Sequence, residues 1–268
     1  MKQITKIYSA IIFAFLYLPI LVLVVFSFNE SKSRVSWTGF TLKWYIKLFN
    51  DNEILKALFN TFIIAVASAL LATLLGSLAA VGIKSMKKFP RKFLMTITDF
   101  PIINPEIVTG VSLMLLFVFA FTTIGFLKPG IATLILAHTT FCTPYVILSV
   151  LPKLRQISPH LYEAAQDLGC PPIKAFLKVV LPDIIPGIIT GMVMAFTLSL
   201  DDFVISYFNS GTTQTLPIAI YSMTRKIVSP EINALSTLLF VVILVLLVMI
   251  NIRQNKEIKL KKVGETYS

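Results

Sequence analysis

Charged residues are scarce in this sequence. They make up 14% of its 268 residues, whereas hydrophobic residues make up 56%. A soluble domain usually carries about a quarter charged residues, so this composition excludes an ordinary water-soluble domain as the main interpretation. The mean hydropathy of +0.83 indicates the same. The chain is therefore expected to have a lipid bilayer rather than water as its principal solvent.

Cysteine and histidine are also rare. Cys142 and Cys170 lie far apart in the sequence, and His138 and His160 are isolated. No CxxC or Cys/His spacing typical of a zinc site is present, and two distant cysteines do not suggest a disulfide framework. The sequence therefore predicts no metal site and no cofactor.

The motifs of catalysis are missing as well. The pattern Gly-x-x-x-x-Gly-Lys-Ser/Thr, which cradles the phosphates of ATP, does not occur. Only the pair Asp201-Asp202 could support a membrane-embedded enzyme, and no His, Cys or Ser constellation accompanies it. We therefore expect a protein that is not itself an enzyme.

The formal net charge of +11 could indicate a partner such as nucleic acid. The basic residues, however, stand between long apolar runs and do not form one basic face. Basic residues in such positions are typical of the segments that flank membrane spans. No nucleic-acid partner is expected.

Several apolar runs are long enough to cross a hydrocarbon core about 30 Å thick, which takes about 20 helical residues. They predict an all-α polytopic membrane protein with six transmembrane helices and a single transmembrane domain over residues 1–268. The first run is too long for the apolar part of a signal peptide, so we expect it to be retained. The predicted spans are 7–29, 57–83, 107–127, 129–152, 184–208 and 232–252.

An even number of spans puts both termini on one side of the membrane. If that side is the cytoplasm, the internal segments hold roughly twice as many lysines and arginines as the external ones, as the positive-inside rule requires. Both termini and the segment 153–183 are therefore predicted to be cytoplasmic. The basic tail that begins at Arg253 is expected to lie against anionic lipid.

Segment 153–183 is expected to contain two short helices. Ser158, which precedes a proline, is a favourable N-cap with a first-turn proline after it. Gly169 is well placed to end the first helix in the left-handed conformation. The second helix is expected to run from Pro171-Pro172 to Leu181-Pro182, where the fifth span begins.

This segment resembles the EAA loop of the permease subunits of bacterial ABC importers. The residues that carry the resemblance are Glu163-Ala164-Ala165, then three residues, Gly169, nine residues, Val179, one residue and Leu181-Pro182. The resemblance implies the type I importer permease fold. It also implies that the first short helix is a coupling helix, which docks in a groove on a separate ATP-binding cassette ATPase dimer.

The resemblance further implies a role for each residue of the motif. Ala164 and Ala165 leave a flat face that lets two backbones approach closely, and Glu163 pairs with a basic group of the ATPase. Gly169 sets the angle to the helix that leads to Leu181-Pro182. When the ATPase closes on ATP, the coupling helix acts as a lever on the fifth span. An ordinary solvated helical hairpin is the alternative that composition alone allows.

Further stretches resemble the permeases of spermidine/putrescine importers, in particular the second of their two permease subunits. These stretches are 17–20, 27–29, 39–45, 137–144, 196–203, 220–223 and 229–234. The resemblance implies polyamine import across a bacterial inner membrane. It also implies a heterodimer with a second homologous permease and an extracytoplasmic polyamine-binding protein that delivers the substrate.

Two other functions stay open. The substrate of an ABC importer with this loop could be another small solute. An ATP-independent secondary transporter is the other alternative, but such proteins often show inverted repeats, and none is visible here. It would also leave the spacing of the loop motif unexplained.

Carboxylates inside the apolar runs fit a polyamine on their own terms. Asp201 and Asp202 interrupt the fifth run, and a charge within a span is costly unless it meets a partner or a watery cavity. The ammonium groups of a polyamine would supply such a partner. Glu106, at the inner end of the third span, is a second candidate for the substrate path. Phe203 or Tyr207 could add cation–π contact.

Alternatives stay open for these acidic residues too. The two aspartates of the fifth span could be solvated at the outer surface or could pair with Arg225 or Lys226. Glu106, together with Asp99, could instead stabilise the first turn of the third span, where a negative charge is favourable.

Overall fold

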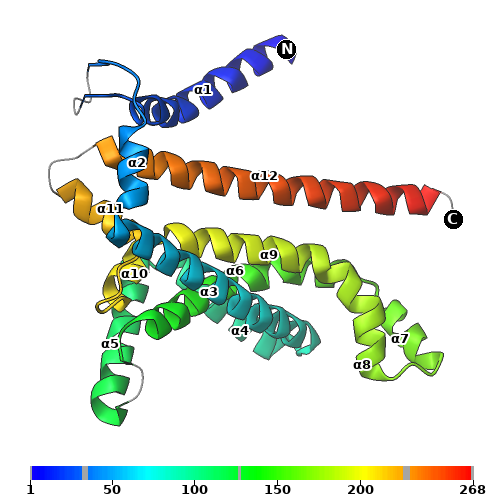
Figure 1. The fold of residues 1–268 in the computed structure, drawn as a ribbon. Helices are drawn as coiled ribbons and strands as arrows, with labels where there is room; N and C mark the ends of the chain where they lie inside the picture. The colour runs from blue at the N-terminus through cyan, green and yellow to red at the C-terminus, as the bar shows by residue number, and fades with distance from the viewer. Residues whose placement is uncertain (1, 32–35, 126–127, 226–229, 267–268) are drawn as a thin grey trace. The chain divides into compact units, whose positions relative to one another are not determined.

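The structure is a computed structural model that describes residues 2–31, 36–125, 128–225 and 230–266. These residues form helices and their connections, and the only β-type pairing among them is one isolated bridge between Asn29 and Phe40 (Figure 1). The prediction of an all-α protein is confirmed. Within the described residues, 5 helices are long and apolar enough to cross a membrane, and a shorter apolar stretch covers Pro230–Val245.

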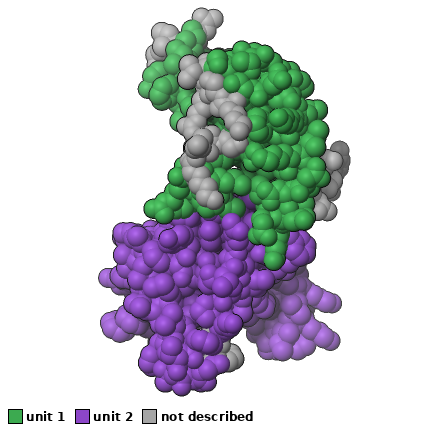
Figure 2. All heavy atoms as spheres, turned by 60° about the vertical axis from the view of Figure 1, so that its left-hand side comes forward, with its two compact units in different colours: residues 1–56, 219–268 green, residues 57–218 purple. Residues whose placement is uncertain are grey.

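The chain divides into two compact units (Figure 2). Unit 1 comprises Met1–Lys56 and Ala219–Ser268, and unit 2 comprises Ala57–Ile218. Unit 2 contains every residue that the sequence assigns to the coupling loop or to the substrate path. The single transmembrane domain over residues 1–268 stays a prediction.

Unit 1 contains α1 (Lys2–Phe26), α2 (Lys43–Asn50), α12 (Pro230–Thr266) and most of α11 (Leu216–Arg225). Trp44 of α2 is buried and donates from Nε1 to the carbonyl oxygen of Asn29, just after α1, at 2.8 Å. Lys47 of α2 pairs with Glu231 at the start of α12, with Nζ and Oε1 2.5 Å apart. Helix α2 therefore contacts the chain just after α1 and the start of α12.

Unit 2 is arranged around α6. Its elements are most of α3 (Asn52–Ser85), α4 (Lys88–Ile103), α5 (Glu106–Ile124), α6 (Ile131–Gln156), α7 (Pro159–Asp167), α8 (Pro172–Ala175), a π-helical segment (Phe176–Val180), α9 (Leu181–Asp201) and α10 (Val204–Asn209). The apolar stretch of α6 is 61% buried, whereas that of α5 is 11% buried. Thus α6 is the inner helix of the unit, and α5 has most of its surface free for lipid or a partner.

Small residues let two helices approach α6 closely. A Cβ atom added to Gly76 of α3 would lie 2.7 Å from the Cβ of Val146. One added to Gly191 of α9 would lie 3.1 Å from the Cα of Val146. Val146 itself is fully buried in α6. Because helices in lipid associate through packing rather than through a hydrophobic drive, such close approach is a principal source of their cohesion.

Helices overlap all six predicted spans, with two departures. The third span, 107–127, corresponds to α5, but a further helix that the sequence analysis does not predict, α4, precedes it and contains Pro101. The fifth span, 184–208, is not one helix. Its backbone leaves the helical conformation at Asp202, with φ −64° and ψ 117°, and resumes as α10 at Val204.

The π-helical segment lies directly before Leu181-Pro182, where the second helix of the loop is expected to end. The N–H of Leu181 donates to the carbonyl oxygen of Phe176, five residues earlier. Pro182 has no N–H, and in an α-helix its ring would clash with the carbonyl of Lys178. The wider π turn removes that clash. The helix therefore continues through the proline.

Candidate coupling loop and substrate path

Helix α7 begins and ends at the predicted residues. Ser158 occupies the N-cap position, with a proline in the first turn. At the other end, Gly169 has φ +82°; its N–H donates to Gln166 at 2.8 Å, and the N–H of Cys170 donates to Ala165 at 3.0 Å. These two bonds form a Schellman motif. A Cβ at Gly169 would meet nothing within 4 Å, so the glycine is required for its backbone angle and not for space.

The residues assigned to ATPase docking lie on the surface of α7. The Glu163 side chain is 64% exposed, and its Oε2 lies 3.4 Å from Nδ1 of the exposed His160. Ala164 is exposed and Ala165 is half-buried. The helix therefore presents a small-residue surface that carries one accessible carboxylate.

The last two residues of the motif, Leu181 and Pro182, lie at the start of α9 and not on α7. Leu181 is half-buried and packs against the hydrophobic core of unit 2, whereas Pro182 is exposed. Helix α7 packs against the π-helical segment that leads into them. The motif thus combines an exposed helix with the base of the fifth apolar helix.

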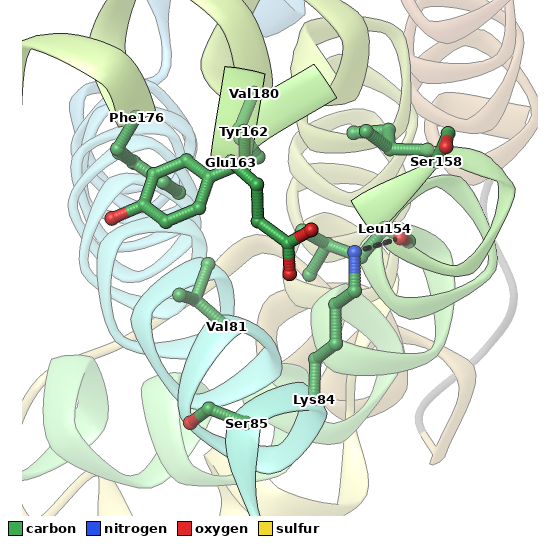
Figure 3. Close-up of a pocket in the computed structure, with 10 residues that line it drawn as sticks. Val81, Lys84, Ser85, Leu154, Ser158, Tyr162, Glu163, Phe176 and Val180 are labelled. Carbon is green, nitrogen blue, oxygen red and sulfur yellow. Dashed lines mark hydrogen bonds between the residues drawn. The ribbon is translucent and has the colours of Figure 1, made fainter. Parts of the chain in front are cut away.

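A pocket of about 350 Å³ separates α7 from the ends of α3 and α6 (Figure 3). Lys84 of α3 and Glu163 of α7 both line it, and the Glu163 carboxylate points toward the Lys84 ammonium group. Lys84 donates to the carbonyl oxygen of Leu154, near the end of α6, at 2.5 Å. Helix α7 therefore borders a hollow, which leaves it room to move.

The aromatic and acidic residues assigned to the substrate path gather around the break between α9 and α10. Asp201 is the last residue of α9 and is exposed. Phe203 lies in the break and Tyr207 on α10, with ring centroids 5.4 Å apart. Tyr207 is 50% exposed. One charged and two aromatic side chains thus come from the end of α9, from the break after it and from the first turn of α10.

Glu106 lies near the same break, because α10 packs on the first turns of α5. Asn209 of α10 donates from Nδ2 to the carbonyl oxygen of Gly110, one turn after Glu106, at 3.1 Å. Glu106 is exposed, and its charge is close enough to act on that of Asp201. It stands in the first turn of α5, as the alternative reading expects, but that reading is wrong for Asp99, which lies inside α4.

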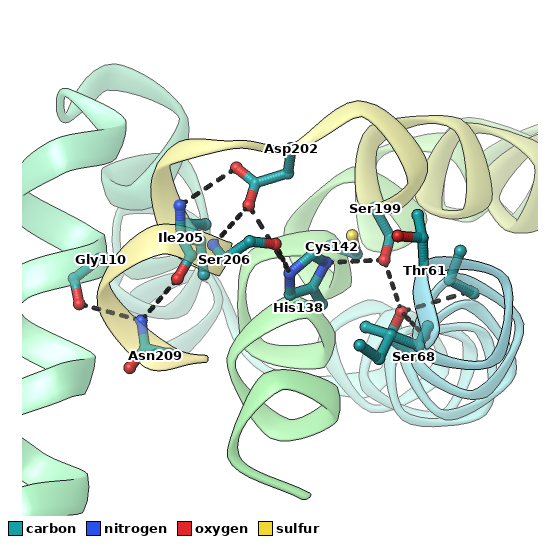
Figure 4. Close-up of polar contacts among 12 residues, drawn as sticks. Thr61, Ser68, Gly110, His138, Cys142, Ser199, Asp202, Ile205, Ser206 and Asn209 are labelled. Atoms are coloured by element: carbon teal, nitrogen blue, oxygen red, sulfur yellow. Dashed lines mark hydrogen bonds and ion pairs between the residues drawn. The ribbon is translucent and has the colours of Figure 1, made fainter. Parts of the chain in front are cut away.

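Asp202 has a different environment from its neighbour. It is buried, and its carboxylate faces the start of α10 (Figure 4). Oδ2 accepts the N–H of Ser206 at 2.9 Å, and Oδ1 accepts the N–H of Ile205 at 3.4 Å. A carboxylate there satisfies free N–H groups and meets the positive end of the helix dipole. Solvation at the outer surface, expected as an alternative for both aspartates, is therefore wrong for Asp202. Lys226, a suggested partner, lies outside the described residues.

His138 of α6, which the sequence analysis treats as isolated, is the centre of a buried network (Figure 4). Its Nδ1 lies 2.7 Å from Oγ of Ser199 in α9, and its Nε2 lies 3.0 Å from Oγ of Ser206 in α10. Nε2 is also 3.6 Å from Oδ2 of Asp202. Oγ of Ser199 lies 2.9 Å from Oγ of Ser68 in α3. An ionisable side chain within an apolar run is a signal of function in membrane proteins, and that signal would have identified His138.

The cysteines take no part in a cluster. Cys142 is buried in α6, and Cys170 is half-buried after the end of α7. Among the described residues, no group of three or more His, Cys, Asp or Glu side chains could hold a metal ion.

Comparison with known proteins gives a family and named relatives. The family model described as binding-protein-dependent transport system inner membrane component matches residues 72–255. The putrescine transport system permease protein PotI of Escherichia coli (strain K12) is 44% identical over 231 residues, which cover 85% of this chain and 82% of that protein. The spermidine/putrescine transport system permease protein PotC of the same strain is 39% identical over 238 residues, 88% of each chain.

A solved structure shares the fold. A chain from a bacterial ABC transporter involved in the import of the acidic polysaccharide alginate superposes with a TM-score of 0.73 and covers 95% of each chain. The two sequences are 20% identical, so this likeness speaks for the fold alone. The importer-permease fold predicted from the sequence is confirmed, and the cytoplasmic location of both termini stays a prediction.

Proposed function

Because the chain belongs to the family of binding-protein-dependent transport system inner membrane components, we propose that it is the permease subunit of an ATP-driven polyamine importer. It forms half of the path for spermidine or putrescine and couples that path to a separate ATPase. The observation that carries this proposal is the identity of 44% and 39% to permeases named for these two polyamines, over most of the chain.

The importer needs three further components. An ATP-binding cassette ATPase dimer supplies the hydrolysis, since the sequence has no phosphate-binding loop of its own. A second homologous permease completes the path, and an extracytoplasmic binding protein delivers the polyamine. The exposed Glu163 and Ala164 on α7 support docking of the ATPase at that helix.

Coupling follows from the continuity of one long helix. From Pro172 to Asp201 the chain is helical for 30 residues, a rise of about 45 Å. The short helix α7 packs against the N-terminal part of this long helix, and the candidate path residues lie around its C-terminal end at Asp201. A displacement of α7 by the ATPase therefore reaches Asp201 without passing through a flexible segment.

The chemistry at the break suits a protonated amine. Asp201 and Glu106 are exposed carboxylates that act on each other electrostatically, and a bound cation relieves their mutual repulsion. The rings of Phe203 and Tyr207 offer π faces to the same cation. A polyamine carries several ammonium groups on a thin chain, so it can meet both carboxylates at once.

The location of basic side chains supports a cytoplasmic α7. Lys88, Arg91 and Lys92 of α4 line one shallow hollow together with Arg155, which lies at the end of α6 that leads into α7. Clustered cations at one end of a membrane protein favour the cytoplasmic side.

Reconstitution in liposomes tests the function. The chain is combined with its ATPase, the second permease and the binding protein, and uptake of labelled putrescine and spermidine is followed with and without ATP. We expect ATP-dependent uptake from the complete set and none when any component is left out. Uptake by this chain alone, or uptake driven by an ion gradient, would contradict the proposal. ATP-dependent transport of another solute in place of polyamines would support the coupling but not the substrate.

A further inference from the structure

The polar network around His138 buries several polar side chains, which costs free energy unless each of them is hydrogen-bonded. His138, Ser199 and Ser206 are each no more than 2% exposed, and Ser68 is fully buried. Each of these polar groups would destabilise an apolar interior if it lost its hydrogen bond, because its hydration is not replaced. The network joins four different helices, so it fixes their mutual positions as long as every member is satisfied.

The bonds of the network can be followed from α3 outward. The hydroxyl of Ser68 donates to the carbonyl oxygen of Ile64 at 2.7 Å and lies 2.9 Å from the hydroxyl of Ser199. Nδ1 of His138 bonds to the hydroxyl of Ser199, and Nε2 bonds to the hydroxyl of Ser206. A hydroxyl can donate or accept, so both bonds form in either tautomer of the ring. Histidine thus bonds to α9 with one nitrogen and to α10 with the other.

The break between α9 and α10 depends on these bonds. Backbone that leaves the helix within a membrane is tolerated only where other groups satisfy it. Asp202 accepts two N–H groups of the first turn of α10, and His138 bonds through Nε2 to the hydroxyl of Ser206 in that same turn. The first turn of α10 is therefore held by Asp202, which directly precedes it, and by His138 of α6.

Helices α6 and α9 both connect to the coupling loop and pack closely on each other. Helix α6 leads into the loop at Gln156, and α9 leaves it at Leu181. Between the coupling loop and the break, Gly191 of α9 lies so near α6 that a Cβ added to it would be 3.1 Å from the Cα of Val146. At the far end of this pair, His138 connects the pair to α10.

We propose that His138 is a positioning residue that joins the α6–α9 pair to α10 and so aims Asp201, Phe203 and Tyr207 into the substrate path. This inference rests on the proposed function of those residues. It assigns His138 no direct contact with substrate. Its role is to make α10 follow the motion that the coupling loop imparts to the pair.

Three substitutions separate the two bonds of the ring. His138→Leu removes both. His138→Gln can place an amide near the position of Nε2 and keep the bond to Ser206, whereas His138→Asn reaches only the position of Nδ1 and Ser199. Thr139→Val is the matched control, because Thr139 is also buried in α6 and its hydroxyl bonds to Ile135 of the same helix at 2.7 Å.

Each variant is reconstituted in the complete importer, and polyamine taken up is measured per ATP hydrolysed. We expect His138→Leu to lower this ratio at least tenfold, His138→Gln to retain more of it than His138→Asn, and Thr139→Val to leave it unchanged. A His138→Leu ratio equal to that of the unmodified chain would overturn the proposal. So would an equal loss in Thr139→Val. If His138→Leu does not assemble, a ratio for His138→Asn equal to or above that for His138→Gln overturns it.

A second measurement needs no transport. With Tyr207→Cys in a Cys170→Ser background, the rate at which a membrane-impermeant thiol reagent modifies position 207 reports the orientation of α10. We expect His138→Leu to change this rate several-fold and Thr139→Val to leave it as it is. An unchanged rate in both variants would contradict the proposal that His138 connects the α6–α9 pair to α10. Absence of polyamine uptake by the unmodified complex, with the rate change present, would instead remove the proposed function alone.

Discussion

Asp201 and Asp202 are consecutive residues with opposite surroundings. The Asp201 side chain is exposed at the end of α9, whereas that of Asp202 is buried and accepts the N–H groups of Ile205 and Ser206. The helix break lets one carboxylate hold the protein together while the other remains available to a cation. The two positions should therefore respond differently to the same substitution.

We expect Asp201→Asn to weaken polyamine uptake without affecting assembly. The change removes a negative charge at an exposed position, and a partly exposed ion pair contributes about 1 kcal/mol at most, equivalent to roughly fivefold in affinity. Initial rates of labelled putrescine uptake at several concentrations would measure the loss, with complex yield as the control. Uptake equal to that of the unmodified chain would exclude Asp201 from the path.

Asp202→Ala should destabilise the chain, whereas Asp202→Asn should be tolerated better. Alanine leaves the first N–H groups of α10 without an acceptor, and loss of such a cap costs about 1 kcal/mol. Asparagine keeps one oxygen in place and is an equally good N-cap in general. The midpoint of thermal unfolding in detergent would show the order. A lower midpoint for the asparagine variant than for the alanine variant would contradict the capping role.

The ends of the coupling helix could be predicted because their signals are local. Ser158 followed by a proline sets the N-terminus, and Gly169 is one of the few residue types that adopts a left-handed angle without strain. The apolar helices were similarly accessible, since length and hydropathy alone decide whether a segment can cross a bilayer.

The break at Asp202 and the role of His138 could not be predicted in the same way. The apolar run continues on both sides of the aspartate pair, so periodicity favours a single span. The break is held by the bonds that Asp202 and His138 make to the turn of residues 204–206. His138 lies in α6, 61 residues before its other partner Ser199, and a bond between residues so far apart in the sequence leaves no local signal. Helix α4 was missed for a related reason, because Pro101 favours a turn in isolation.

Two glycines of α3 provide a matched test of helix packing. We expect Gly76→Ala to destabilise the chain by about 1–3 kcal/mol, because the new methyl group would lie 2.7 Å from the Cβ of Val146. Gly82→Ala should instead stabilise it by about 0.5–1 kcal/mol, since nothing lies within 4 Å of the added Cβ and alanine is the better helix former. Thermal unfolding of the purified variants would give the two signs, and equal shifts would refute the close contact.

Glu163→Lys should abolish ATP-driven uptake and ATPase assembly while leaving membrane insertion intact. The side chain is 64% exposed, so the folded chain loses little from the change, but the docking surface gains the wrong charge. Glu53→Lys is the control, because Glu53 is an exposed carboxylate in the first turn of α3. Co-purification of the ATPase with each variant would report docking. Normal co-purification and uptake by Glu163→Lys would remove α7 from the coupling mechanism.

The native cysteines allow the orientation of α7 to be measured without substitution. Cys142 is fully buried, whereas Cys170 is half-buried directly after Gly169, so Cys170 is expected to dominate reaction with thiol reagents. A membrane-impermeant maleimide should label the chain in inside-out vesicles and not in intact cells, and Cys170→Ser should remove the signal. Docked ATPase should slow the reaction, because it would cover the end of α7. Labelling in intact cells would place the coupling loop outside, where no ATPase could reach it, and the mechanism proposed for this chain would fail with it.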